Sequence, residues 1–201
     1  PQVFPFIPLA FTRRSIDASR ERAEGFYQEM SRRGTTRHFS PEQVPQDLIE
    51  RAIHTAATAP SGAHQQPWTF VAVSDQATKQ AIRDAAEAEE RQFYHGRAPQ
   101  EWIDALAPLG TDEHKAHLTD APWVIVLSRQ AHGYNPDRSK RTFYYTQEWC
   151  GIAAGFFIAA VHRMGLVRLT HTPNPMGFLR DLLGARSARR AHSPHEPAES
   201  R

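Results

Sequence analysis

Cysteine is almost absent from the sequence, and long apolar runs and a strong net charge are missing as well. The one cysteine, Cys150, excludes a disulfide framework and a site with several cysteine ligands, and a lone thiol fits the reducing cytoplasm. The longest apolar run, 150–161, is shorter than the about 20 residues that a membrane-spanning helix needs. The formal charge of +2 indicates no large nucleic-acid-binding surface. No metal is expected, because the histidines have no carboxylate or cysteine at ligand spacing.

Length and composition indicate a single folded domain followed by a tail. The 201 residues suit one domain, or one subunit of an intertwined oligomer. The hydrophobic fraction of 40% and the charged fraction of 23% are typical of soluble globular proteins, in which we expect Cys150 to be a core residue. After Gly184 the sequence turns to Arg, His, Pro, Ser and Glu without a helix or strand period. We predict a folded domain over 1–184 and a disordered basic tail over 185–201.

Hydrophobic periodicity divides the folded part into alternating helices and strands. The clearest helix begins near Pro45 and places apolar residues from Leu48 to Ala57 at helical spacing. A second helix, over 142–164, is apolar nearly all round, so we expect it to be buried on most sides. The alternation predicts an α/β or α+β fold around one sheet, which has few strands for so many helices. Further helices are expected at 15–33, 76–94, 101–106 and 177–183, strands at 69–73, 123–127 and 166–169, and a polar loop at 131–141.

Three separate polar segments have a composition that suits a flat ligand carrying a phosphate group. In 58–68, the turn Pro60-Ser61-Gly62 lets backbone N–H groups approach a ligand without a Cβ clash. Segment 33–37 offers two guanidiniums and two hydroxyls, which suit a phosphate. Segment 170–173 follows a predicted strand and presents hydroxyls and N–H groups to a ring edge. Each segment alone also has an ordinary explanation. Segment 58–68 would be a connector, 33–37 a solvent-facing Arg pair, and 170–173 a polar turn.

The order and spacing of these segments resemble the flavin-dependent nitroreductase superfamily, and in particular its iodotyrosine deiodinase branch. The resemblance extends from about Phe4 to Gly184 and therefore covers most of the chain. It includes the long apolar helix as well as the three segments. The supporting motifs are Glu89-Glu90 followed by Tyr94, Leu109-Gly110-Thr111 followed by Lys115, and Leu169-Thr170-His171-Thr172-Pro173-Asn174-Pro175.

The resemblance implies a nitroreductase-like fold with a mixed central sheet, an intertwined homodimer, and FMN bound at the dimer interface. NAD(P)H or a reductase partner would reduce the FMN, which would carry the redox chemistry. The hydroxyl of Thr170 would lie near flavin N5, which favours stepwise electron transfer and makes Thr170 the implied catalytic residue. The implied FMN-binding residues are Arg33, Gly34, Thr35, Thr36 and Arg37 at the phosphate and ribityl chain, Pro60, Ser61 and Gly62 along the isoalloxazine ring, and Thr170, His171 and Thr172 on its other side.

The resemblance also implies the substrate, a halogenated tyrosine that undergoes reductive dehalogenation. Glu90, Tyr94 and Lys115 correspond to the substrate-binding residues of the branch, and Ala63 corresponds to the residue near the phenolate. Their chemistry fits, because Glu90 suits the ammonium group of an amino acid and Lys115 suits its carboxylate. Glu90 and Tyr94 are four residues apart and so share one helix face. Without the resemblance, Glu90 would be interpreted as part of a solvent-exposed, Glu-rich helix face.

The sequence departs from the branch in two places. Gly34 stands where relatives often carry a second Arg. After Gly184, basic sequence replaces the expected hydrophobic strand and the arm that embraces the partner subunit, which we interpret as the result of a frameshift or a premature stop. Two alternatives therefore stay open: a general nitroreductase or flavin reductase, and a truncated remnant with weak or no activity.

Overall fold

The computed structural model describes residues 8–184, which fall into two compact units. The first unit ends at Gly34 and contains helix α1 (Ile16–Ser31). Ser15 caps this helix as predicted, because its side chain accepts a backbone N–H bond at 3.2 Å. No residue of α1 is buried. The tail predicted over 185–201 lies outside the described residues.

The second unit begins at Thr35 and is built on two strands, β1 (Trp68–Val73) and β2 (Val124–Arg129). They pair antiparallel along their whole length, and among the described residues they form a sheet of two strands. The mixed pairing implied by the resemblance is therefore not seen within 8–184. The other elements are α2 (Gln46–Ala57), η1 (Gly62–His64), α3 (Gln76–Gln92), η2 (Phe93–Arg97), α4 (Gln100–Leu106), η3 (Ala107–Leu109), α5 (His117–Asp120), β3 (His132–Tyr134), β4 (Lys140–Thr142), α6 (Thr146–Arg163) and α7 (Gly177–Leu183).

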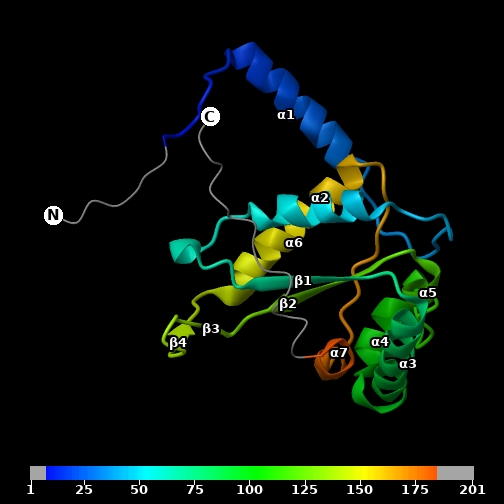
Figure 1. Cartoon of the computed structure of the whole chain (residues 1–201). Helices are drawn as coiled ribbons and strands as arrows, with labels where there is room; N and C mark the ends of the chain where they lie inside the picture. The colour runs from blue at the N-terminus through cyan, green and yellow to red at the C-terminus, as the bar shows by residue number, and fades with distance from the viewer. Residues whose placement is uncertain (1–7, 185–201) are drawn as a thin grey trace. The chain divides into compact units, whose positions relative to one another are not determined.

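Alternate side chains of β1 enter two different hydrophobic cores. Trp68 and Phe70 pack against α2 and α6, together with Ala153. Val73 packs against α3 and α5, in contact with the cluster around Ile82, and residues of α7 pack against the same cluster. Figure 1 shows α2 and α6 on one side of the two strands and α3 and α7 on the other. This alternation is that of a strand that is covered on both faces.

The prediction of a polar loop at 131–141 is wrong for part of that segment, because β3 and β4 form an antiparallel hairpin there. Its strands are short and polar, so they lack the apolar alternation that indicates a strand. Gly133 is required at its position, since a Cβ there would lie 2.7 Å from the Phe143 ring. The other predicted helices, and the strands at 69–73 and 123–127, are confirmed to within a few residues.

The predicted strand at 166–169 is also wrong, since the segment pairs with no strand of the described residues. Its carbonyl at Arg168 instead accepts the Thr36 N–H at 3.2 Å. Helix α6 begins at Thr146 rather than near 142, because β4 extends to Thr142 and Tyr145 has a positive φ of 51°.

Helix α6 is less buried in the described chain than its apolar composition predicts. Cys150, Ala153 and Val161 are buried, but Phe156 is 40% exposed and both Gly151 and Gly155 are exposed. Among the described residues no helix combines the length and the apolar character that crossing a membrane requires. The open face of α6 is therefore a surface that the described chain leaves uncovered.

Lys79 fastens α5 to α3 from a nearly fully buried position. Its side chain is on α3, its exposed fraction is 4%, and its Nζ donates to the carbonyls of Thr119 at 3.2 Å and Ala121 at 2.7 Å. Burial lowers the pKa of Lys79, and the nearby charge of Asp120 opposes this shift. The ammonium group therefore replaces water as the donor to two carbonyls at the end of α5.

Replacing Lys79 by Met should lower the free energy of unfolding by about 1–3 kcal/mol, because the carbonyls of Thr119 and Ala121 would lose their donor while the apolar bulk remains. Urea unfolding followed by circular dichroism would measure the change. Lys140→Met, at an exposed position of β4, is the control and should change the value by less than about 0.5 kcal/mol. A Lys79→Met protein as stable as the wild type would contradict this role.

Candidate active site

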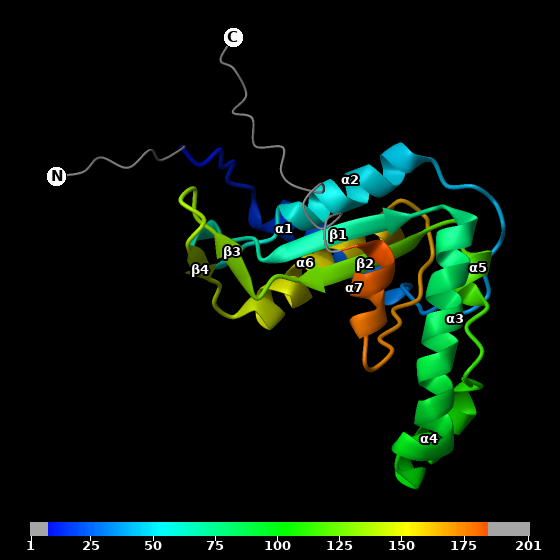
Figure 2. The same ribbon diagram turned by 60° about the horizontal axis from the view of Figure 1, so that its bottom comes forward.

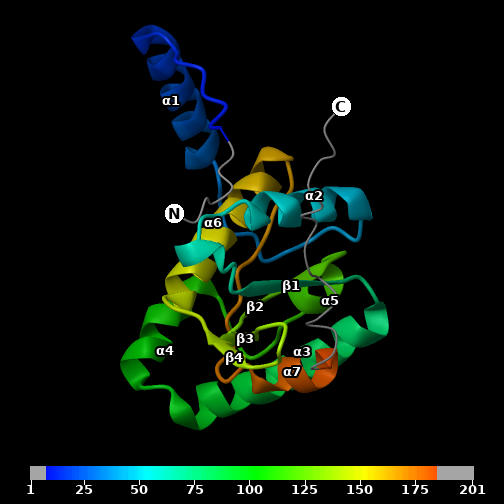
Figure 3. The same cartoon turned by 60° about the vertical axis from the view of Figure 1, so that its left-hand side comes forward.

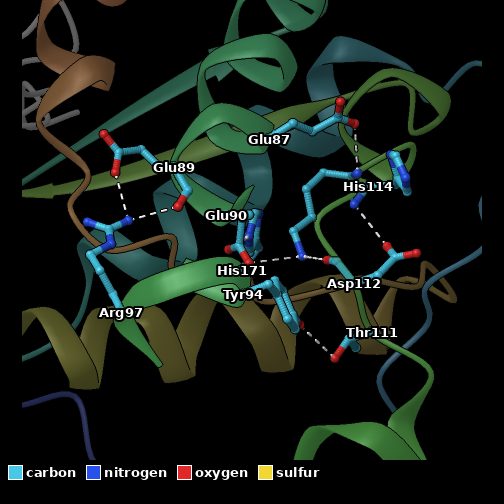
Figure 4. Close-up of polar contacts among 10 residues, drawn as sticks. Glu87, Glu89, Glu90, Tyr94, Arg97, Thr111, Asp112, His114 and His171 are labelled. Carbon is cyan, nitrogen blue, oxygen red and sulfur yellow. Dashed lines mark hydrogen bonds and ion pairs between the residues drawn. The ribbon is translucent and has the colours of Figure 1, made fainter. Parts of the chain in front are cut away.

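Glu90 lies at the centre of a mostly buried charged cluster, which consists of Glu90, Lys115 and His171 (Figure 4). The Glu90 Oε2 lies 3.2 Å from the Lys115 Nζ, and its Oε1 lies 3.1 Å from the His171 Nε2. The exposed fractions of these side chains are 14% for Glu90, 8% for Lys115 and 19% for His171. Ions that are this well buried need partners, and here each charge has the other as its partner.

Helix α3 also fixes the backbone of Lys115. The Glu87 Oε1 accepts the Lys115 N–H at 2.8 Å and a bond from the Arg83 Nε at 2.7 Å. Arg83 in turn donates to the Thr119 hydroxyl at 2.9 Å. Burial acts to raise the pKa of Glu87, but the bonds from Lys115 and Arg83 outweigh it and the pKa is lowered.

Tyr94 lies one turn beyond Glu90 and adds an aromatic surface to the cluster. The Lys115 Nζ is 5.6 Å from the centre of the Tyr94 ring, which is a cation–π distance. The Tyr94 hydroxyl donates to the Thr111 hydroxyl at 3.2 Å, and the Lys115 Nζ donates to the Asp112 carbonyl. Figure 4 shows Tyr94 and Glu90 on the same side of the helix, whereas Glu89 points away toward Arg97.

His171, which contacts Glu90, packs against a second histidine, His117. The rings of His171 and His117 meet edge to face, with centroids 5.2 Å apart. Burial, followed by the nearby His171 and Lys115, lowers the pKa of His117 to about 4. Burial also lowers the pKa of His171, although its hydrogen bond to Glu90 opposes this shift. Both shifts favour the neutral imidazole, and since a carboxylate accepts hydrogen bonds, the His171 Nε2 carries the proton that it donates.

The loop between α2 and β1 has a strained backbone that side-chain bonds hold in place. Ala63, His64 and Gln66 have positive φ values of 49°, 52° and 44°, which cost non-glycine residues of the order of 1–3 kcal/mol each. The Ser61 Oγ accepts the Gln66 N–H at 2.8 Å, and the Gln66 side chain donates to the Ala57 carbonyl at 2.9 Å. Hydrogen bonds within the chain thus hold the conformation of this loop.

Trp149 of α6 lies behind this loop. A Cβ built on Gly62 would be 3.5 Å from the indole ring, so loop and ring are in near contact. The Trp149 Nε1 is buried and has no hydrogen-bond partner among the described residues. Gln65 ties the other side of the loop to the segment before α6, through bonds to Thr142 at 3.3 Å and Tyr144 at 3.2 Å.

Thr170 lies beside the segment that begins the second unit. Its Oγ1 accepts a bond from the Arg168 Nη1 at 2.6 Å, and the Arg168 carbonyl accepts the Thr36 N–H. Thr36 and Thr170 are therefore brought together. Thr170 and Thr172 are both exposed.

The structure brings some of the predicted site residues together and separates others. Glu90, Tyr94 and Lys115 meet, and His171, predicted on the FMN side, contacts Glu90. The loop with Pro60, Ser61, Gly62 and Ala63 precedes β1, whereas α3 follows it, so the loop and α3 lie at opposite ends of this strand (Figures 1 and 3). Arg33 and Gly34 belong to the first unit, and Thr35, Thr36 and Arg37 belong to the second.

Sequence reasoning missed four residues that support these groups: Glu87, His117, Arg168 and Trp149. Glu87 precedes Glu90 by three residues on one helix face, which is a signal that helical spacing contains. For His117 the sequence contains no signal beyond the absence of a metal-ligand spacing. Within 8–184, no group of three or more His, Cys, Asp or Glu is placed to hold a metal ion.

Comparison with known proteins defines the class of the chain. The sequence model of the nitroreductase family matches residues 30–188, which is most of the chain. The chain therefore belongs to the nitroreductase family, and the α+β fold with helices around small sheets is that of its relatives.

Among the relatives with similar sequences are iodotyrosine deiodinases. That of Haliscomenobacter hydrossis is 49% identical over 178 residues, which cover 89% of this chain and 80% of the relative. Those of Hydra vulgaris and Danio rerio are 42% and 41% identical over 89% of this chain, which spans 66% and 61% of their length, slightly under two thirds.

Solved structures show the same relationship. A crystal structure of oxidized iodotyrosine deiodinase bound to FMN and 3-iodo-L-tyrosine has a TM-score of 0.69 and 25% identity, over 79% of this chain and 80% of that one. A nitroreductase with bound FMN from Desulfitobacterium hafniense DCB-2 has a TM-score of 0.58 at 19% identity, over 85% and 81%, and shares the fold.

Replacing Glu87 by Gln should release the backbone of Lys115. Hydrogen exchange of the Lys115 amide should become at least about tenfold faster, since its acceptor would lose its charge and its ion pair with Arg83. Because the pKa of Glu87 is lowered by folding, its contribution to stability is present above the unfolded pKa and is lost as the pH falls through the folded value. Glu89→Gln, which faces Arg97 instead, is the control. Equal exchange rates in the two variants would rule out this role of Glu87.

Proposed function

We propose that this protein is an FMN-dependent oxidoreductase that removes halogen reductively from halotyrosines. The observation that carries the proposal is the ion pair of Glu90 and Lys115, because a mostly buried carboxylate and ammonium, 3.2 Å apart, match the two charges of an amino-acid zwitterion. Tyr94 supplies an aromatic surface beside them. The iodotyrosine deiodinase relatives, and the neighbouring structure bound to FMN and 3-iodo-L-tyrosine, support the same substrate class.

Binding would exchange one ion pair for two. In the free protein the Glu90 carboxylate and the Lys115 ammonium neutralise each other. The substrate ammonium would take the place of Lys115 at Glu90, and the substrate carboxylate would accept from Lys115. Neither buried charge is left unpaired in this exchange, which avoids the penalty of an isolated buried ion.

The residues of the second unit fit FMN in their chemistry. Arg37 has no carboxylate partner within 8–184, so its guanidinium is available for a phosphate, together with the hydroxyls of Thr35 and Thr36. The sequence prediction for the phosphate also includes Arg33 and Gly34. The loop of Pro60, Ser61 and Gly62 would follow the flat ring, and the buried Trp149 Nε1, which has no acceptor in the described chain, lies beside this loop.

Thr170 would act at the reacting edge of the cofactor, with Thr172 and His171 next to it in the chain. The Thr170 Oγ1 accepts a bond from Arg168 and keeps its own proton to donate. The backbone of Ala63, held at a positive φ, would meet the phenolate of the substrate. When bound and reduced, FMN would supply two electrons, and together with one proton from solvent they would replace the carbon–halogen bond by a carbon–hydrogen bond and release halide.

A homodimer would bring the two parts of this site together. β1 has six residues and so spans roughly 20 Å at about 3.3 Å per residue, with the ring-binding loop at one end and α3 at the other. Figure 2 shows α3 leading away from the sheet beyond that end. A second copy could place its charged cluster over the loop of the first, and it would cover the open faces of α6 around Phe156 and of α1 around Tyr27.

We place the protein in the cytoplasm, where NAD(P)H or a reductase partner would reduce the FMN. The only cysteine, Cys150, is a buried free thiol, and burial raises its pKa. A thiol of this kind has no partner for a disulfide and is unreactive.

Replacing Glu90 by Gln in the FMN-loaded protein should weaken halotyrosine binding by about 100-fold or more, because the substrate ammonium would lose its buried counter-charge. Quenching of flavin fluorescence during a titration with 3-iodotyrosine would measure the affinity. Glu89→Gln, next in the chain and paired with Arg97, should bind like the wild type. A wild type that reduces nitroaromatics and binds no halotyrosine would instead identify a general nitroreductase.

The purified wild type should be yellow and sediment as a dimer. Phe156→Glu should give a monomer and release FMN, since it places a charge on the open face of α6. Tyr134→Glu, at an exposed aromatic of the hairpin, should leave both properties unchanged. A colourless wild-type monomer would support the truncated remnant, and a monomer that retains FMN would refute the shared site.

A further inference from the structure

We infer that His171 is a positioning residue for substrate recognition, which holds Glu90 by one carboxylate oxygen and makes the affinity for the substrate ammonium depend on pH. The inference rests on the proposed function and adds a residue to it. Its basis is geometric. The His171 Nε2 lies 3.1 Å from the Glu90 Oε1, while the Lys115 Nζ lies 3.2 Å from the Oε2.

The two carboxylate oxygens of Glu90 therefore have separate tasks. Oε2 is the oxygen that would exchange its ion pair with Lys115 for an ion pair with the substrate ammonium. Oε1 keeps its bond to the neutral His171, which donates from Nε2 in both states. The rotamer of Glu90 is thus fixed before and after the exchange, and less side-chain entropy is lost on binding.

His171 joins two segments that are far apart in the chain. It lies between Thr170 and Thr172, which are proposed to approach the cofactor, and its contact with α3 spans 81 positions of sequence. Its ring packs edge to face on His117 of α5. The residue thus lies between the proposed cofactor segment and the carboxylate of Glu90, and its ring is fixed from two sides.

The charges around His171 determine the direction of the pH effect. Glu90 comes from α3, Lys115 from the segment before α5, and His117 from α5, with Asp120 and Arg83 further out beside His117. A protonated His171 would add a second cation at Glu90 and compete with the substrate ammonium. Burial keeps the pKa of His171 below its usual value, which favours the neutral form of the ring.

The sign of the linkage follows from these charges. A bound substrate ammonium would lower the pKa of His171 further, because it brings another cation close to the ring. The affinity is therefore complete above the pKa of His171 in the free protein and falls as the pH decreases through that value. His117, with a pKa of about 4, stays neutral over most of this range.

The test is a series of 3-iodotyrosine titrations of the FMN-loaded protein between pH 5 and 8. The wild type should lose affinity toward the acidic end, beyond the change caused by the substrate phenol. His171→Ala should bind about tenfold more weakly at pH 7.5. His171→Gln keeps a donor at similar reach and does not titrate, so it should regain most of the affinity and lose the additional acid dependence. His54→Asn, an exposed histidine of α2, is the control and should match the wild type.

Each outcome bears on one of the two proposals. If the wild type binds 3-iodotyrosine and His171→Gln has the same pH profile as the wild type, His171 is not the positioning residue, while the proposed function stands. If the wild type binds no halotyrosine at any pH, the proposed function is overturned, and this inference with it. As a readout independent of FMN, the imidazole nitrogen spectrum of the FMN-free protein should show His171 protonated at Nε2 at pH 7.5, and protonation at Nδ1 would refute the hydrogen bond.

Discussion

The antiparallel pairing of β1 with β2 is the constraint on which the rest of the structure depends. β1 contributes to both cores, since Trp68 and Phe70 face α2 and α6 while Val73 faces α3. The strained loop enters this strand and the helix that carries Glu90 leaves it. A slip of one residue in the ladder would turn each of these side chains toward the opposite core. It would also displace both parts of the proposed site together.

Those features of the fold that repeat at short range could be predicted from the sequence. The apolar spacing along α2 and the short apolar runs of β1 and β2 determine local structure through burial alone. The shared face of Glu90 and Tyr94 follows from helical geometry. The family was recognisable from the order of several motifs, and it is confirmed by a match over 30–188.

The rest depends on contacts between distant segments, which leave no periodic trace. The hairpin of β3 and β4 is polar and depends on the close approach of Gly133 to Phe143. The segment 166–169 has strand-like residues, but an extended segment becomes a strand only where a neighbouring strand forms backbone hydrogen bonds with it. The resemblance places His171 on the FMN side, and only the fold reveals that its ring also reaches Glu90. The tail and the assignment of the domain boundary at 184 stay predictions.

The mutual neutralisation of Glu90 and Lys115 has a consequence for which ligands the proposed site would exclude. A simple amine or a simple carboxylic acid could engage only one member of the pair and would leave the other uncompensated at 8–14% exposure, a loss of roughly 3–5 kcal/mol. Such molecules are abundant in any cell, and the closed pair rejects them without any steric barrier. Only a ligand that carries both charges at the right separation can replace each partner with an equivalent one. In the proposed site, charge balance would thus select amino acids before the aromatic ring is recognised at all.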